Sequence, residues 1–200
     1  MRMKDFHRKG ERMTYEEAIA LLRSFKIEPG HDWDRHCIGV GEIAYRLALE
    51  IQKYRMIDPE QVRVMGLVHD FGRSVSQDPY RHAYEGYKLM KEFGKEEYAR
   101  ICVCHSNGTY KEEDLEAYGL KPEDFYVRTL EEKLVFIGDS LESKGRIIRH
   151  EVRIAQTIER YRDKNPKFIP VLEGKLEEFK TFDREVSGII GKSVYAFFGI

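Results

Sequence analysis

Apolar residues recur along this chain at helical spacing, whereas the strict alternation that is typical of strands does not appear. Residues 14–17 read Thr-Tyr-Glu-Glu, a capping-box pattern that predicts the start of a helix. Between residues 34 and 54 nearly all apolar positions fall on one helical face at about 100° per residue, and His36 lies on that face too. Pro59 follows an aspartate and predicts the first turn of another helix, which is apolar nearly all round near its end and is therefore expected to be buried.

The rest of the chain continues the helical pattern. A loop with short helical turns is expected over 107–128, which holds Gly108, Gly119 and Pro122. We therefore expect an all-α helical bundle with a loose N-terminal tail at 1–13, a helical domain at 14–165 with its core at 30–165, and a C-terminal helical extension at 166–200 packed on the same domain. Further helices are expected at about 82–93, 95–106, 130–150, 151–163 and 171–192.

Composition narrows the class of protein. The 200 residues are 42 % hydrophobic and 34 % charged, which excludes a disordered chain, and no apolar run approaches the ~18 residues of a membrane span. The net charge is −1, so neither a nucleic-acid coat nor a membrane-surface protein is expected. The first residues hold no apolar segment of a secretory signal, and the cysteine number is odd, so a reducing, cytoplasmic location is expected. Cys37, Cys102 and Cys104 fit small buried hydrophobic residues better than a zinc site.

Six polar side chains stand where apolar ones belong. Each follows an apolar run or lies on the inner face of a helix, and burying the carboxylates unpaired would cost several kcal/mol. A single metal cluster would satisfy all of them. Imidazole nitrogen and carboxylate oxygen together suit Fe, Mn, Ni, Co or Zn rather than Mg alone. The candidate ligands are His36, His69, Asp70, His82, His105 and Asp139.

Taken singly, these residues have simpler interpretations. A His-Asp pair is a weak signal, because the chain contains a second one at residues 31–32. That pair follows Pro29-Gly30 in a loop, and Asp32 or Asp34 is better interpreted as a helix cap. A lone inward histidine such as His36 is more often a hydrogen-bonded core residue than a ligand. The ordered series of all six residues favours a metal site over these simpler interpretations.

The series resembles the HD superfamily of metal-dependent phosphohydrolases over roughly residues 30–165. HDFGR is similar to the HDIG-type variant, with Phe71 in place of isoleucine and Arg73 in place of the usual lysine. The turns at 82–86 and 105–108 are similar to those of the small diadenosine tetraphosphate hydrolases, and Gly138 precedes the last aspartate where alanine is commoner. The motifs are His36, His69-Asp70 in LVHDFGR, His82 in HAYEG, His105 in CHSNG and Asp139 in IGDSLESKGR.

This resemblance implies an all-α bundle with the metal site inside. It implies that His36, His69, Asp70 and Asp139 form the core ligand set. His82 and His105 are similar to the extra ligands of the subset with two metals, in which the aspartate of the pair bridges both ions. The implied cofactors are two divalent transition-metal ions, Fe or Mn ahead of Ni, Co or Zn.

The function expected from this site is hydrolysis of a phosphate ester or anhydride in a small nucleotide-like substrate by a metal-activated hydroxide. Such a reaction needs cations for the phosphate oxygens, and Arg73 and Arg146 are the candidates that we prefer. On a helical wheel Arg146, Arg149, Arg153 and Arg160 fall on one face, which is also compatible with a plain solvated surface. A di-iron oxygenase of the same fold and a non-catalytic nucleotide-binding module are the alternatives.

The last seven residues, 194–200, are unusually apolar for a terminus. An apolar patch of this kind requires a covering surface. We expect the segment to dock on its own bundle, with a homodimer contact as the alternative.

Overall fold

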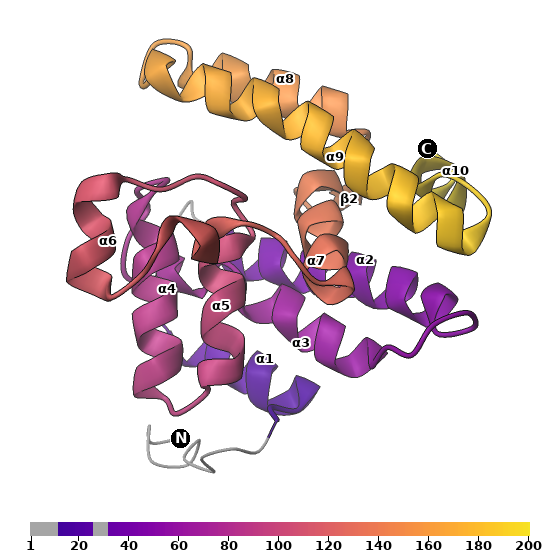
Figure 1. Cartoon of the computed structure of the whole chain (residues 1–200), viewed down its shortest axis with the longest axis horizontal. Coiled ribbons are helices and arrows are strands. Elements are labelled where there is room, and N and C mark those ends of the chain that lie inside the picture. The colour runs from indigo at the N-terminus through magenta and orange to yellow at the C-terminus, as the bar shows by residue number, and fades with distance from the viewer. Residues whose placement is uncertain (1–11, 26–31) are drawn as a thin grey trace.

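The computed structural model describes residues 12–25 and 32–200, and nearly all regular structure in this part of the chain is helical (Figure 1). The expected all-α class is confirmed, with one small antiparallel hairpin as an addition. In chain order the elements are α1 (Tyr15–Ser24), α2 (Trp33–Ile51), α3 (Pro59–Val68), η2 (Phe71–Ser74), α4 (Arg81–Glu92), α5 (Glu96–Cys104), α6 (Glu112–Tyr118), η3 (Pro122–Phe125), α7 (Leu130–Leu141), β1 (Glu142–Ser143), β2 (Arg146–Ile147), α8 (His150–Tyr161), η4 (Pro166–Phe168), α9 (Ile169–Ile190) and α10 (Val194–Phe198).

The helix starts follow the expected capping chemistry. The Thr14 hydroxyl accepts a hydrogen bond from the Glu17 amide, and the Glu17 carboxylate accepts one from the Thr14 amide. Asp58 caps α3 in the same way, with Pro59 at the first helical position. Of the expected loose tail, residues 1–11 lie outside the described part of the chain, whereas Met13 is buried and its amide donates to the Tyr98 hydroxyl.

Helices α2, α3 and α7 form the centre of the bundle and approach one another closely. A Cβ on Gly66 of α3 would lie 2.6 Å from the Cα of Gly41 on α2, so these two helices can cross only through glycines. A Cβ on Gly138 of α7 would lie 2.9 Å from the carbonyl oxygen of Val40. Gly138 therefore brings α7, and the Asp139 that follows, directly against α2.

The helix expected over 130–150 was wrong beyond Leu141. Lys144 and Gly145 have φ values of 52° and 78°, which lie in the left-handed region and cannot continue an α-helix. They turn the chain between β1 and β2, and the Glu142 carboxylate accepts a hydrogen bond of 2.6 Å from the Gly145 amide. Arg146 consequently lies on β2 and does not share a helical face with Arg153.

Helices α8 and α9 lie side by side across one end of the bundle, and α7 leads up to them (Figure 1). We call α8, η4 and α9 the roof. Ile154, Phe168 and Leu172 form its own small apolar cluster, and the Phe168 ring contacts Tyr80 with centroids 5.6 Å apart. The far half of α9 joins the main core.

The C-terminal segment packs on the core of its own chain. Val194 of α10 is fully buried, and the Tyr195 ring stacks on Phe179 of α9 with centroids 5.5 Å apart. The Arg46 guanidinium of α2 lies over the Phe198 ring. Among the described helices, none has the length and hydropathy that a membrane crossing requires.

Candidate metal centre

The six histidine and aspartate side chains singled out in the sequence come together from five helices. They lie on α2, at the end of α3, on α4, just after α5 and on α7. Their donor atoms form two groups, and within each group the atoms lie within 4.8 Å of one another. We call the six residues the His/Asp cluster. The first group is His36, His69 and Asp139, and the second is Asp70, His82 and His105.

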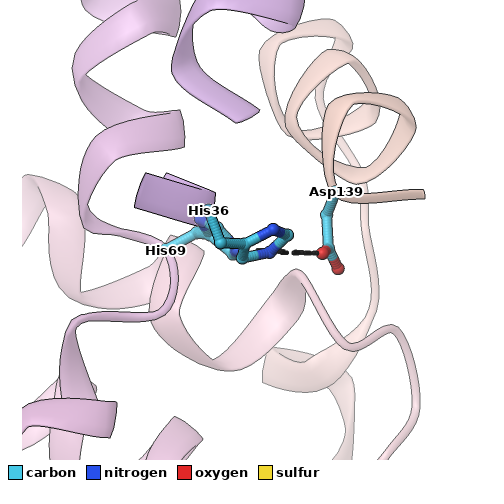
Figure 2. Close-up of side chains that lie close together, drawn as sticks. All are labelled: His36, His69 and Asp139. Atoms are coloured by element: carbon cyan, nitrogen blue, oxygen red, sulfur yellow. Dashed lines mark hydrogen bonds and ion pairs between the residues drawn. The ribbon is translucent and has the colours of Figure 1, made fainter. Parts of the chain in front are cut away.

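In the first group both imidazoles face the same carboxylate oxygen, Oδ1 of Asp139. The Nε2 atom of His36 lies 3.0 Å from Asp139 Oδ1, a contact that Figure 2 shows, and Nε2 of His69 lies 3.9 Å from the same oxygen. The His36 and Asp139 side chains are 17 % and 20 % exposed, whereas the His69 side chain is fully buried. This group therefore has one open side.

The second group is buried on all sides and is more compact. The Oδ1 atom of Asp70 lies 3.1 Å from His82 Nε2 and 3.4 Å from His105 Nε2. The Oδ2 atom of the same carboxylate lies 4.0 Å from Nε2 of His69, which belongs to the first group. Asp70 therefore stands between the two groups, with one oxygen on each side.

Each imidazole in the cluster is oriented by its other nitrogen. Nδ1 of His69, His82 and His105 faces a backbone carbonyl oxygen at 2.7, 2.9 and 3.1 Å, so it carries the proton and donates it. Nδ1 of His36 donates to the Glu142 carboxylate. The Nε2 atoms of His69, His82 and His105 are left with a lone pair directed into the cluster, the arrangement that is typical of histidine ligands to metals, whereas Nε2 of His36 faces the Asp139 carboxylate.

Two of these inward atoms are buried without any hydrogen-bond partner among the described residues: Nε2 of His69 and Oδ1 of Asp70. Lone pairs of nitrogen and carboxylate oxygen that face one another without a shared proton repel, and burial increases the cost. A cation between them removes both problems. Three histidine or carboxylate donors per group are a set that suits Fe, Mn, Ni, Co or Zn, so the residues fit such an ion.

The protonation of the cluster follows from its carboxylates. Burial lowers the pKa of His36, but hydrogen bonds to Asp139 and Glu142 outweigh it and raise the pKa to about 9. Burial lowers the pKa of His69 to about 4, so this imidazole is neutral. Burial would raise the pKa of Asp70, but Arg73 and His82 hold it well below its usual range. Both aspartates are therefore ionised and able to hold a cation.

The sequence pattern did not indicate Glu142 as a site residue, and it did not favour Arg153 over Arg146 as a cation for the phosphate oxygens. Glu142 is buried and orients His36, as a second carboxylate behind the first group. Arg153 of α8 donates to Asp139 Oδ1 at 3.1 Å and to the Glu142 carbonyl oxygen. A signal for Glu142 was available, because it follows Asp139 by three residues and shares its side of the chain. No comparable signal marks Arg153, whose position depends on the hairpin.

A cavity of about 860 Å³ lies over the His/Asp cluster, between the bundle and the roof. Arg73 lines it, as expected, although its Nε also donates to Asp70 Oδ2 at 2.5 Å. The preference for Arg146 needs correction, because this residue is exposed on β2 and does not line the cavity, whereas Arg153 does. The hairpin turn is the cause, since it ends the helix that was expected to carry Arg146 inward.

The remaining candidates behave as ordinary structural residues. His31 lies outside the described residues, and Asp32 is the exposed N-cap residue of α2, in neither group of the cluster. Cys37, Cys102 and Cys104 are free and buried, and neither group of the cluster includes them. They pack as small apolar side chains, as expected.

Comparison with known proteins agrees with this geometry. Residues 33–162 match the HD domain, and the match contains all six residues of the cluster. This chain belongs to the HD domain family. HD domains bind divalent metal ions, the family consists in general of metal-dependent hydrolases, and both donor groups of this chain lie within the matched residues.

Relatives of this HD domain protein come from archaea. It is 39 % identical to the uncharacterized protein MJ0778 of Methanocaldococcus jannaschii over 132 residues, which are 64 % of this chain and 75 % of the relative. It is 27 % and 26 % identical to proteins named tRNA (cytidine(56)-2'-O)-methyltransferase from Picrophilus torridus and Thermoplasma volcanium. Those matches cover 76 % and 74 % of this chain but only 42 % and 41 % of the methyltransferases. No solved structure gives a significant match.

Proposed function

We propose that this protein is a metal-dependent phosphohydrolase that cleaves a phosphate ester or anhydride of a nucleotide-like substrate. The observation that carries the proposal is the pair of adjacent donor groups with inward, unpartnered lone pairs at the base of a cation-lined cavity. We assign one divalent transition-metal ion to each group, Fe or Mn ahead of Ni, Co or Zn. Bound there, the ions would acidify a water molecule and offset the charge on the phosphoryl oxygens.

Contacts within the protein hold the candidate metal donors in position for this chemistry. Asp70 has one oxygen for each group, and its position is fixed by the Arg73 guanidinium. The backbone carbonyls behind His69, His82 and His105 hold the imidazoles in one orientation. Because these contacts exist before substrate arrives, little reorganisation is needed during the reaction.

Arg73 and Arg153 have a double role in this proposal. Each donates to a cluster carboxylate through part of its guanidinium, and each lines the cavity. A guanidinium has five N–H donors, so the remaining donors of both arginines are available for phosphate oxygens. We therefore place the phosphoryl group that is attacked between these two arginines and the His/Asp cluster.

The test is elemental analysis of the purified protein combined with a hydrolysis screen. The metal-free protein is loaded separately with Mn, Fe, Co, Ni and Zn and is offered nucleotides and dinucleoside polyphosphates, with and without dioxygen. We expect phosphate release with at least one redox-inert ion and no requirement for dioxygen. A product that forms only with iron and dioxygen would show an oxygenase instead. Nucleotide binding without turnover under every metal would show a regulatory module.

A further inference from the structure

Lys175 is a cation in the cavity that neither the motifs nor the family match indicated. It lies on α9, thirteen residues beyond the end of the match at residue 162. It lines the same cavity as His36, Asp70 and Asp139, although it comes from the roof and they come from the bundle. Its side chain is therefore brought to the candidate site by the C-terminal extension.

The cations that line the cavity fall into two sets. Arg73 and Arg153 form ion pairs with Asp70 and Asp139. Arg35, Lys144, Arg160 and Lys175 form no ion pair with any residue in the described ranges 12–25 and 32–200. Arg35, Lys144 and Arg160 are exposed, so water solvates their charges. Lys175 alone of these four is half-buried.

As long as no ligand is bound, a half-buried ammonium without a counter-ion is unfavourable. Burial lowers the pKa of Lys175, and the negative charges of Asp139 and Glu178 only partly oppose this. Divalent ions in the His/Asp cluster would offset the charge of Asp139 and leave Lys175 with less compensation. An anionic ligand in the cavity supplies the missing counter-charge.

The backbone of Lys175 is tied to the metal-binding helix. His150 Nε2 lies 3.3 Å from the Lys175 carbonyl oxygen, and His150 Nδ1 lies 3.1 Å from the carbonyl oxygen of Ser140, the residue after Asp139. His150 is buried and its ring stacks on Phe179 with centroids 4.7 Å apart. Burial lowers the pKa of His150, so its neutral imidazole donates to one of these two carbonyl oxygens, and its position between them keeps α9 close to α7.

We propose that Lys175 binds the phosphoryl group next to the one that is attacked, so that the site prefers substrates with a phosphoanhydride over monophosphates. This inference rests on the proposed function for the position of the attacked group. Arg73 and Arg153 each donate to an aspartate of the cluster, whereas Lys175 reaches the same cavity from a different helix, α9, without such a contact among the described residues. The volume of about 860 Å³ leaves space beyond the cluster for a second phosphoryl group and a nucleoside.

The test measures binding to the metal-loaded protein by calorimetry, with methylenediphosphonate as an uncleavable diphosphate and inorganic phosphate as the single group. Lys175→Met removes a charge-assisted hydrogen bond and is expected to weaken diphosphonate binding ~10-fold or more, with a much smaller effect on phosphate. Lys175→Arg is expected to restore most of the affinity. Lys180→Met is the matched control, since Lys180 is exposed on the same helix and pairs with Glu177.

Two results would overturn the inference: unchanged diphosphonate binding in Lys175→Met, or equal weakening for phosphate and diphosphonate. If Lys175 had a purely structural role, Lys175→Met would lower the melting temperature instead. Glu178→Gln would then lower it too, because Glu178 carries a buried oxygen without a partner among the described residues. If Lys175→Met does not fold, Lys175→Gln replaces it in the same comparison. Diphosphonate binding through Lys175 in a protein that hydrolyses nothing would refute the proposed function and keep this inference. Hydrolysis that is unchanged in Lys175→Met would refute this inference and keep the proposed function.

Discussion

The His/Asp cluster and the roof line one cavity from opposite sides, and they differ in how their charged side chains are buried and paired. In the cluster, four of the six residues are at most 3 % exposed, and every imidazole is oriented by a hydrogen bond from Nδ1. In the roof, Arg160 and Lys175 have no ion pair within the described residues. Under the proposed function, the cluster holds cations, and the two unpaired cations of the roof face an anionic substrate.

The difference follows from where each region lies in the bundle. Four of the six donors lie on or directly after α2, α3 and α7, whose backbones touch through Gly41, Gly66 and Gly138, so these donors cannot move apart without breaking the core. The roof rests on a small apolar cluster and on the buried face of α9. Substrate preference can therefore change on α9, where Lys175 pairs with none of the cluster residues, without disturbing the metal donors.

The largest expected effect is at the residue that joins the two groups. Asp70→Asn removes the negative charge between them, and we expect phosphatase turnover to fall at least ~10³-fold, since several kcal/mol of charge stabilisation are lost. Helicity, measured by circular dichroism, should change little. Asp32→Asn is the matched control from the other His-Asp pair and should stay within a few-fold of the parent. Equal behaviour of the two variants would show that the wrong pair was chosen.

The second comparison separates the two donor groups. His82→Ala and His105→Ala each remove one of the three donors of the buried group, and elemental analysis should show a fall from about two ions per chain to about one. Turnover should fall with the metal content. A parent protein that never exceeds one ion, together with fully active variants, would reject the second metal position.

A smaller effect is expected where the roof supports the cluster. Arg153→Met removes the donor to Asp139 Oδ1, and we expect metal affinity or turnover to fall about 10- to 100-fold, the usual cost of losing a partner behind a ligand. Arg146→Met changes the same residue type on exposed β2 and should leave metal affinity unchanged. Metal titration of both variants is the measurement. If Arg146→Met had the greater effect, the hairpin would not place these arginines as described.

The smallest effect is on stability. Deletion of residues 194–200 uncovers Phe179 and removes buried Val194, whose burial contributes about 1.5–3 kcal/mol. For a chain of this size the melting temperature should fall by roughly 5 °C. Light scattering on the same samples tests the alternative of a dimer contact. A melting temperature and a mass that both stay unchanged would contradict docking on the bundle and docking on a partner alike.

Much of this protein can be predicted from local patterns. The helical class, the capping box at Thr14 and the choice of the six candidate donors follow from the sequence, because helical period and capping depend on residues three or four positions apart. His105 could be selected because it follows the apolar run 101–104, and His82 because it opens a helix at the place where the family resemblance expects an extra ligand. These features need no knowledge of which helix packs on which.

The tertiary structure decided the rest. α7 ends where Glu142 becomes extended, and the left-handed turn at Lys144 and Gly145 leaves Arg146 on the surface, whereas Arg153 of α8 reaches Asp139. Lys175 reaches the cavity only because α9 returns over the bundle and His150 fixes its backbone. Periodicity along the chain determines which side of a helix is buried, but which charges meet across a cavity depends on turns and packing between segments far apart in the sequence.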